Sequence, residues 1–224
     1  MNKMPPQRWA VPAYFHPDGD AAEWAQLSAS GVALVVANVA DGPGLVREES
    51  WAATLDDVGT GGSDVVGYVS TGYLGLTGLR TRLGSTFLDD WLSQILNDVN
   101  TWYALYGDIV TGIFFDQVTE SEDGASIAPV FRRLRDHVHH HDPNAVIVLN
   151  AGAALPVSFA DLADVVVTFE GPCEAYLGSS GDTGFEPLTW HRRPGQAIWH
   201  IVHDVPDAVR AGEVVALRDR KSVV

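Results

Sequence analysis

The sequence has little cysteine and little positive charge, and each shortage narrows what the protein can be. Its 224 residues include a single cysteine, Cys173, so no disulfide can form within the chain and no oxidising compartment is required. Lysine and arginine number 14 against 29 acidic residues, which gives a formal net charge of −15. Nucleic acids and anionic membranes would repel such a chain, whereas neutral and cationic ligands would not.

Long apolar runs are also missing. No run of roughly 18 apolar residues occurs, so the sequence predicts no membrane-spanning helix. The segment before Trp9 lacks the apolar stretch of about 7–15 residues that a secretory signal carries. As given, the sequence therefore predicts a cytoplasmic protein, and a secreted one only if a signal has been removed. No repeat or linker divides the chain, and we expect residues 1–224 to form a single domain.

Two patterns alternate along the chain. Apolar, strand-like runs span residues 10–17, 32–40, 64–73, 110–118, 145–152, 164–171 and 197–205. Segments with helical spacing of apolar residues span 21–30, 49–58, 87–107, 126–141, 156–163 and 208–221. This alternation predicts an α/β protein with parallel strands, and the unbroken apolar runs predict a sheet covered on both faces.

Two architectures fit this order, a doubly wound open sheet and a (β/α)8 TIM barrel. Nearly every strand-like run ends in a polar residue: His16, Asn38, Ser70, Asp116, Asn150, Glu170 and His203 or Asp204. Barrel enzymes place their chemistry at the C-terminal ends of all strands, whereas an open sheet gathers it at one switch point. We therefore predict the barrel. Its eighth strand must be short or truncated, beginning near residues 222–224.

Two of these strand ends carry acids that could act together. Side chains alternate between the faces of a strand, so the sequence predicts three sets that share a face: Gly112, Phe114 and Asp116; Val146, Val148 and Asn150; Val166, Thr168 and Glu170. If these faces point into the barrel, Asp116 and Glu170 converge with Asn150 between them, their carboxyls about 5–9 Å apart. That range includes the carboxyl pairs of retaining and of inverting glycoside hydrolases. The alternative is a turn cap for Asp116 and a solvated loop acid for Glu170.

Other side chains at strand ends are candidates for holding a substrate. They are His16, Tyr14, Asn38, Tyr68, Tyr73, Gln117, Asn150, His200 and His203. We expect Trp199 to be buried behind the barrel. The run of His137 and His139 to His141 lies at a helix C-terminus, where imidazole offsets the helix dipole, so no metal is predicted. The glycines of 72–78 match neither phosphate-loop pattern, and no cofactor is predicted.

Taken in order, several motifs resemble one family. "VPAYFHP", "VVANVADGPG", "VVGYVSTGY", "GIFFDQV", "VIVLNAG" and "TFEG" lie between about Val11 and His203, and together they resemble the spherulation-specific family 4 (spherulin-4-like) proteins. The resemblance implies a (β/α)8 barrel and a glycoside hydrolase that cuts α-1,4-linked galactosamine or N-acetylgalactosamine polymers. It also implies Asp116 and Glu170 as the catalytic acids. The family's hydrolases tend to have Asp-Glu where this chain has Asp116 and Gln117.

The sequence thus predicts a glycoside hydrolase that acts on an amino-sugar polysaccharide without a metal or cofactor. Glu170 is the preferred general acid, with Asp116 as nucleophile or as stabiliser of an oxocarbenium-like transition state. Two alternatives remain open: a non-catalytic glycan-binding barrel, which Gln117 favours, and an intracellular cyclase or isomerase that binds a small molecule. The expected partner is a carbohydrate or small-molecule substrate, and the sequence does not indicate an oligomeric state.

Overall fold

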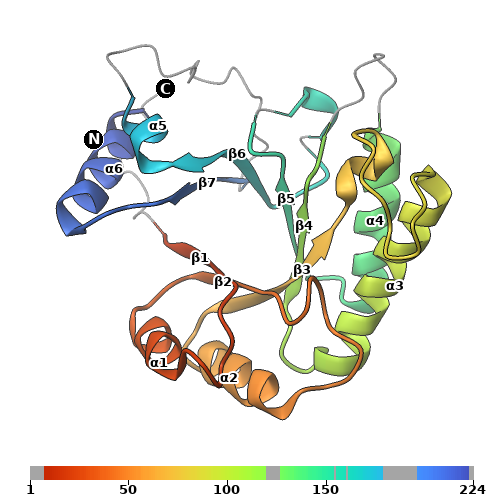
Figure 1. The fold of residues 1–224 in the computed structure, drawn as a ribbon, viewed down its shortest axis with the longest axis horizontal. Helices are drawn as coiled ribbons and strands as arrows, with labels where there is room; N and C mark the ends of the chain where they lie inside the picture. Colours follow the sequence, from red (N-terminus) through yellow and green to blue (C-terminus); the bar gives the residue numbers. More distant parts are fainter. Residues whose placement is uncertain (1–7, 120–126, 154, 160, 179–195, 222–224) are drawn as a thin grey trace.

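Seven parallel strands curve around a common axis with helices on their outer side (Figure 1). This computed structural model describes residues 8–119, 127–153, 155–159, 161–178 and 196–221. The strands follow one another in chain order from β1 to β7, and within the described residues no pairing joins β7 to β1. The order confirms the barrel rather than the doubly wound sheet, with one unsealed seam. Residues 222–224, where we expected an eighth strand to begin, lie outside the described part of the chain.

The strands occupy all seven predicted runs. They are β1 (Ala10–Ala13), β2 (Leu34–Ala37), β3 (Asp64–Ser70), β4 (Gly112–Asp116), β5 (Val146–Asn150), β6 (Val165–Pro172) and β7 (Ala197–His203). The helices are α1 (Ala21–Ala29), α2 (Glu49–Thr60), α3 (Leu88–Tyr106), α4 (Ala128–His141), α5 (Cys173–Leu177) and α6 (Ala208–Lys221). Short 3-10 turns, η1 (Gly72–Gly75) and η2 (Val157–Phe159), lie in the loops after β3 and β5.

Two short elements differ from the prediction. The helix expected over 156–163 is only the turn η2, and α5 was not predicted at all. Short helices are marginal by themselves and owe their stability to tertiary packing, so their own sequence identifies them poorly. Among the described residues, no helix is both long and apolar enough to cross a membrane.

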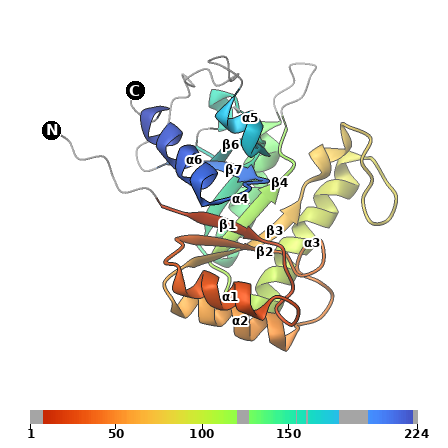
Figure 2. The ribbon, with the colours of Figure 1, turned by 60° about the vertical axis from the view of Figure 1, so that its left-hand side comes forward.

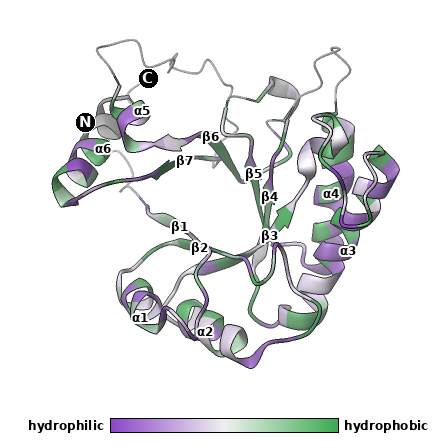
Figure 3. Ribbon diagram, in the orientation of Figure 1, coloured by the Kyte–Doolittle hydropathy of each residue, from purple (hydrophilic) through white to green (hydrophobic). Residues whose placement is uncertain are grey.

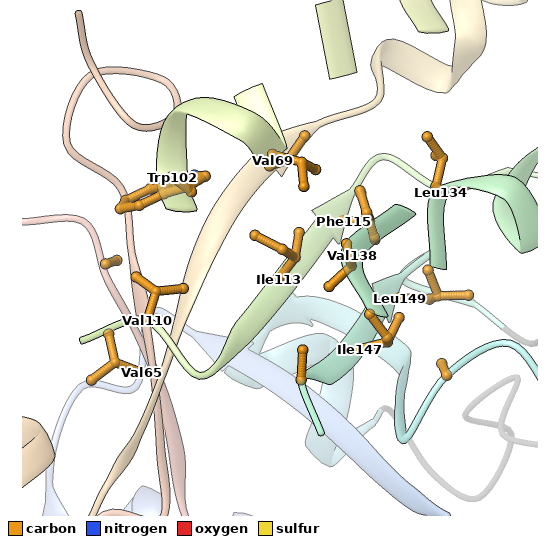
Figure 4. Close-up of a cluster of buried hydrophobic side chains, with 14 of the residues drawn as sticks. Val65, Val69, Trp102, Val110, Ile113, Phe115, Leu134, Val138, Ile147 and Leu149 are labelled. Carbon is orange, nitrogen blue, oxygen red and sulfur yellow. The ribbon is translucent and has the colours of Figure 1, made fainter. Parts of the chain in front are cut away.

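One apolar core lies between the strands and the helices. Outward-facing Ile113, Phe115, Ile147 and Leu149 of β4 and β5 pack with Leu134 and Val138 of α4 in a single buried cluster (Figure 4). The central strands are mostly hydrophobic, whereas the helices mix hydrophilic and hydrophobic residues, as amphipathic helices do (Figure 3). On the other side of the barrel, α1 and α2 lie side by side outside β1 to β3 (Figure 2).

The Trp102 ring of α3 fixes how closely this helix approaches β3. The ring is fully buried, and its Nε1 donates a hydrogen bond to the backbone oxygen of Tyr68 over 2.8 Å. A Cβ atom added to Gly67 would lie 2.5 Å from the Trp102 ring. Glycine is therefore required at this strand position because the indole fills the space where a side chain would be.

A second apolar core fills the barrel itself. It consists of Leu34, Val36, Val66, Tyr68, Phe114, Val148, Val167 and Trp199. Trp199 is 8% exposed, and its ring meets that of Phe114 edge-on with centroids 5.9 Å apart. The prediction that Trp199 lies behind the barrel is therefore wrong. Trp199 pairs with Val167, and both side chains point towards the barrel axis.

A β-bulge interrupts β6. Val167 pairs with Trp199 and Phe169 pairs with the next residue of β7, His200, so Thr168 is an extra residue in β6. The predicted shared face of Val166, Thr168 and Glu170 is wrong for Val166, which belongs to the outer core, whereas Val167 belongs to the inner core. Because the bulge shifts the alternation by one residue, Phe169 faces outwards and the following residue, Glu170, turns inwards.

Candidate active site

Three polar side chains meet at the C-terminal ends of β4, β5 and β6, a region we call the mouth of the barrel. Asn150 Nδ2 donates one hydrogen bond to Asp116 Oδ1 and another to Glu170 Oε2, each over 2.7 Å. Two oxygens that both lie 2.7 Å from one nitrogen can be no farther apart than twice that distance. An amide nitrogen carries two hydrogens, so Asn150 satisfies both acceptors at once. The structure thus places the two carboxyl groups in a single site.

The Asn150 amide is itself fixed. The residue is 3% exposed, and its Oδ1 accepts a hydrogen bond from the backbone N–H of Gly152 over 3.0 Å. Gly152 has a φ of +61°, a left-handed conformation that glycine adopts without strain. This turn after β5 leaves the Asn150 amide only one orientation that serves all three partners.

Asp116 accepts hydrogen bonds on both carboxylate oxygens. Besides the bond from Asn150, Tyr68 Oη donates to Asp116 Oδ2 over 2.9 Å. Burial raises the pKa of the Asp116 carboxyl, and the negative charge of Glu170 raises this pKa further. The hydrogen bonds from Tyr68 and Asn150 offset that increase only in part. Asp116 therefore holds its proton more readily than an ordinary aspartate does.

Glu170 has a different environment. Its side chain is exposed, and among the described residues its Oε1 accepts no hydrogen bond. The carboxyl group can therefore rotate its free oxygen towards a ligand, while Asn150 restrains the other. The two acids consequently differ in how rigidly the protein positions them.

Two tyrosines complete the mouth. The Tyr14 ring meets the Tyr68 ring edge-on with centroids 5.6 Å apart, and about half of Tyr14 is exposed. Burial and the charge of Asp116 raise the pKa of both phenols, so each keeps its proton and can only donate to an anion. The exposed part of Tyr14 at the end of β1 gives the site a flat aromatic surface next to the two acids.

Gln117 supports the neighbouring loop instead of the acid pair. Its Oε1 accepts hydrogen bonds from Ser70 Oγ over 2.7 Å and from the backbone N–H of Gly72 over 3.1 Å. Gln117 has a φ of +60°, which is costly for a residue with a side chain. Gln117 directly follows Asp116, and its strained backbone turns the Gln117 amide towards the start of η1.

Three further candidate residues lie at strand ends but are engaged in local contacts. Asn38 Oδ1 accepts a hydrogen bond from the backbone N–H of Gly42 over 2.8 Å. His16 Nε2 lies 3.7 Å from a carboxylate oxygen of Glu48. Tyr73 is half-buried in η1, with a φ of +50°. None of these contacts joins the residue to the Asp116 and Glu170 pair.

The two histidines of β7 lie on different faces. His203 is exposed and its Nδ1 lies 2.8 Å from Asp204 Oδ2. His200 pairs with Phe169 beyond the bulge, and its Nδ1 lies 2.8 Å from Tyr176 Oη of α5. His200 therefore faces the outer helices and not the mouth. The prediction that Trp199 lies on the outer side of the barrel implied that its neighbour His200 faces inwards, and the structure reverses both directions.

Asp41 also contributes to the mouth, although the sequence did not single it out. It follows β2 in a left-handed turn with a φ of +50°, and it is exposed. Its negative charge helps to raise the pKa of Tyr68. In the sequence, the signal that could have identified Asp41 was an acid at the start of the "DGPG" turn, directly after an apolar run.

Comparison with known proteins identifies a family and several structures with the same fold. The model of spherulation-specific family 4 matches residues 8–222. The crystal structure of Aspergillus clavatus Sph3 in complex with GalNAc has a TM-score of 0.74 and 23% identity, covering 97% of this chain and 86% of that one. A family 39 glycoside hydrolase from Bacteroides cellulosilyticus WH2 has a TM-score of 0.60 and 11% identity, covering 96% of this chain and 53% of that one. None of the curated proteins matches the sequence.

Proposed function

The chain belongs to spherulation-specific family 4, and from that premise we propose that it is a glycoside hydrolase with Asp116 and Glu170 as its catalytic acids. The observation that carries this proposal is the single Asn150 nitrogen that donates to both carboxylates over 2.7 Å. Most glycoside hydrolases cleave the glycosidic bond between two such groups. Gln117 does not weaken the proposal, because its amide is bonded to Ser70 and Gly72 and stands outside the pair.

The short separation of the two acids favours a retaining mechanism. The oxygens next to Asn150 lie no farther apart than twice 2.7 Å. Carboxyl groups are about 5–5.5 Å apart in retaining enzymes and about 6.5–9.5 Å apart in inverting enzymes, which must fit a water molecule between the general base and the sugar. The upper limit for the oxygens in this chain lies within the retaining range.

The environments of the two acids suggest their roles. Tyr68 and Asn150 hold Asp116 in one position by donating to both of its oxygens, as a nucleophile requires, whereas within the described residues Glu170 keeps one oxygen that can turn to the glycosidic oxygen. These contacts carry the assignment, because the raised pKa of Asp116 opposes the ionised form in which it would attack. In the first step Glu170 gives its proton to the glycosidic oxygen, the bond from that oxygen to the anomeric carbon breaks, and Asp116 bonds to this carbon. In the second step a water molecule loses a proton to Glu170 and displaces Asp116 from the sugar.

The proposed substrate is a polymer of galactosamine and N-acetylgalactosamine. The Sph3 structure was solved with GalNAc, and Tyr14 offers an aromatic surface of the kind that packs against sugar rings. Free amino groups make such a polymer cationic, and a protein with a net charge of −15 attracts it.

The test is the release of reducing ends from a partly deacetylated galactosamine polymer. Glu170→Gln should lower the rate by about 10²–10⁴-fold, as expected for loss of a general acid, and Asp116→Asn by at least as much. His200→Gln is the matched control, because His200 faces the outer helices, and it should retain activity. Proton NMR of the first products should show the anomeric configuration of the substrate.

Two results would reject the proposal. Unchanged rates in both acid variants would exclude the carboxylate pair. Calorimetric binding of the polymer to the wild-type protein without any release of reducing ends would indicate a non-catalytic glycan-binding barrel instead.

A further inference from the structure

Two imidazole rings and an amide oxygen converge between α3 and α4. His137 and His141 lie four residues apart and therefore share one face of α4, with ring centroids 5.3 Å apart. Asn100 Oδ1 of α3 lies 2.8 Å from His137 Nε2 and 2.9 Å from His141 Nε2. The Nε2 atoms of both rings thus point at one atom of the neighbouring helix, Asn100 Oδ1.

Packing fixes the direction of these rings. The His141 ring lies flat on the Tyr103 ring of α3, with centroids 4.6 Å apart and planes within 5° of parallel. Tyr103 lies one turn along α3 from Asn100, so the stack and the amide come from the same helix face. His139 is directed elsewhere, since its Nε2 lies 3.2 Å from the backbone oxygen of Ala145. Only His137 and His141 of the histidine run are therefore brought to Asn100.

We propose that His137, His141 and Asn100 bind a divalent late transition-metal ion such as Zn²⁺ or Ni²⁺, and that this ion links α3 to α4. Imidazole nitrogen suits these metals, whereas Mg²⁺ and Ca²⁺ prefer sites built from oxygen alone. The ion would lie beside the two hydrogen bonds, about 2.1 Å from each Nε2 and from Asn100 Oδ1, and would replace both bonds. Each ring offers its Nε2 lone pair when its proton is on Nδ1, which keeps the ring neutral.

The ligand set is small. Within the described ranges, no three His, Cys, Asp or Glu side chains converge on a possible metal position. The proposed site would therefore consist of two imidazoles and one amide oxygen, with water expected in the remaining positions. The histidine run alone did not predict it, because the third ligand comes from α3, about 40 residues earlier in the chain.

The position of the site indicates a structural role. Helices of a parallel barrel run opposite to its strands, so the last turn of α4 lies at the end of the barrel away from the mouth. Stability, not catalysis, is the usual contribution of that end. A metal ion here would join α3 to α4, which now meet through the two hydrogen bonds to Asn100 and through side-chain packing.

The experiment is a titration of the untagged, chelator-treated protein with ZnCl₂ and with NiCl₂, followed by calorimetry and by thermal unfolding. We expect one ion per chain at micromolar concentrations and a higher melting temperature, and no effect of MgCl₂. His137→Gln should weaken binding at least about tenfold, as should His141→Gln, while Asn100→Ala should weaken it less. His140→Gln is the matched control from the same run and should bind as the wild type does.

His137→Gln decides the question because, unlike His141→Gln, it leaves the stack on Tyr103 intact. Circular dichroism would establish that each variant is folded. Wild-type affinity in His137→Gln would overturn the proposal, and so would an equal loss in His140→Gln or the absence of binding below millimolar metal. None of these readouts involves glycan turnover, so the result is independent of the proposed function.

Discussion

Asp116 combines two opposing influences on one side chain. Tyr68 and Asn150 donate to its oxygens and favour the anion, while burial and the neighbouring Glu170 disfavour it, and the net effect is a raised pKa. Folding thus places a carboxylate where ionisation is costly. Such a cost is common at catalytic sites, where groups are arranged for reaction at the expense of stability.

This cost predicts how Asp116→Asn changes stability with pH. A carboxyl whose pKa is raised by folding supports the fold most when it is protonated, and this support is lost as the pH rises through the folded-state pKa. The amide introduced by the substitution cannot ionise. The unfolding temperature of the variant minus that of the wild type should therefore increase as the pH rises from about 4 through the raised pKa, whatever the substitution itself costs in hydrogen bonds from Tyr68 and Asn150. Thermal unfolding followed by circular dichroism across this range would measure it, and a constant difference at every pH would contradict it.

The sequence identified Asp116, Asn150 and Glu170 because each is a polar residue that ends an apolar run. The sequence could not show with which groups each side chain forms hydrogen bonds. Gln117 is a plausible sugar ligand by position, yet its amide is bonded to Ser70 and Gly72. These bonds depend on a backbone with positive φ, which no local pattern in the sequence indicates.

At the scale of elements, the bulge in β6 decides which face Glu170 occupies. Thr168 is the extra residue, and its buried hydroxyl has no hydrogen-bond partner within the described chain. An unsatisfied buried hydroxyl destabilises a protein, so local stability does not explain why threonine is at this position. The consequence for the site is that the bulge accommodates the extra residue, so Glu170 faces inwards although it lies three residues after the inward-facing Val167.

Deleting Thr168 should leave the two acids in one site. Without the extra residue, Val167, Phe169 and Glu170 alternate regularly, so Glu170 still faces inwards and the deletion variant should keep activity that Glu170→Gln loses. Thr168→Val is the matched control. It keeps the residue count, removes the unpaired hydroxyl, and should be as active as the wild type and no less stable. Reducing-end assays and circular dichroism would compare the variants, and a folded but inactive deletion variant would refute this account of the bulge.

Close packing of α3 on β3 leads to a prediction about Gly67. Gly67→Ala would place a Cβ 2.5 Å from the Trp102 ring, and we expect a loss of about 1–3 kcal/mol in the free energy of unfolding. Gly59→Ala in α2 is the control, because an added Cβ meets nothing within 4 Å there, and it should stabilise by about 0.5–1 kcal/mol. Urea denaturation would measure both values. Equal stability of the two variants would show that Trp102 can move aside.

At the scale of the whole molecule, the fold was the most predictable feature. Seven apolar runs with polar ends were sufficient to choose a barrel over an open sheet, because both the strand order and the position of the site depend on where the runs end. The short or truncated eighth strand that we predicted would lie at the seam between β7 and β1, but its residues 222–224 lie outside the described part of the chain. Pairing at a seam depends on geometry around the full circle, and no single segment contains that information.

The net charge of −15 predicts how salt affects turnover. An acidic protein attracts a cationic polymer over distances of about a Debye length, which salt shortens from about 10 Å at 0.1 M to about 3 Å at 1 M. The kcat/KM for partly deacetylated galactosamine polymer should fall at least about tenfold over this range. The fully acetylated polymer is uncharged, and its turnover should stay nearly constant. Equal salt dependence of the two substrates would exclude electrostatic attraction as a basis for choosing between them.

The bulge in β6 also bears on how relatives of this chain should be compared. The spacing between the inward-facing Val167 and Glu170 is three residues, an odd number that only an irregular strand permits. A homologue with one residue fewer in this strand would present the glutamate inwards from a regular strand, whereas one with the same number of residues and no bulge would present it to the outer helices. An alignment of relatives along the sixth strand therefore has to place the bulge before it can match their glutamates.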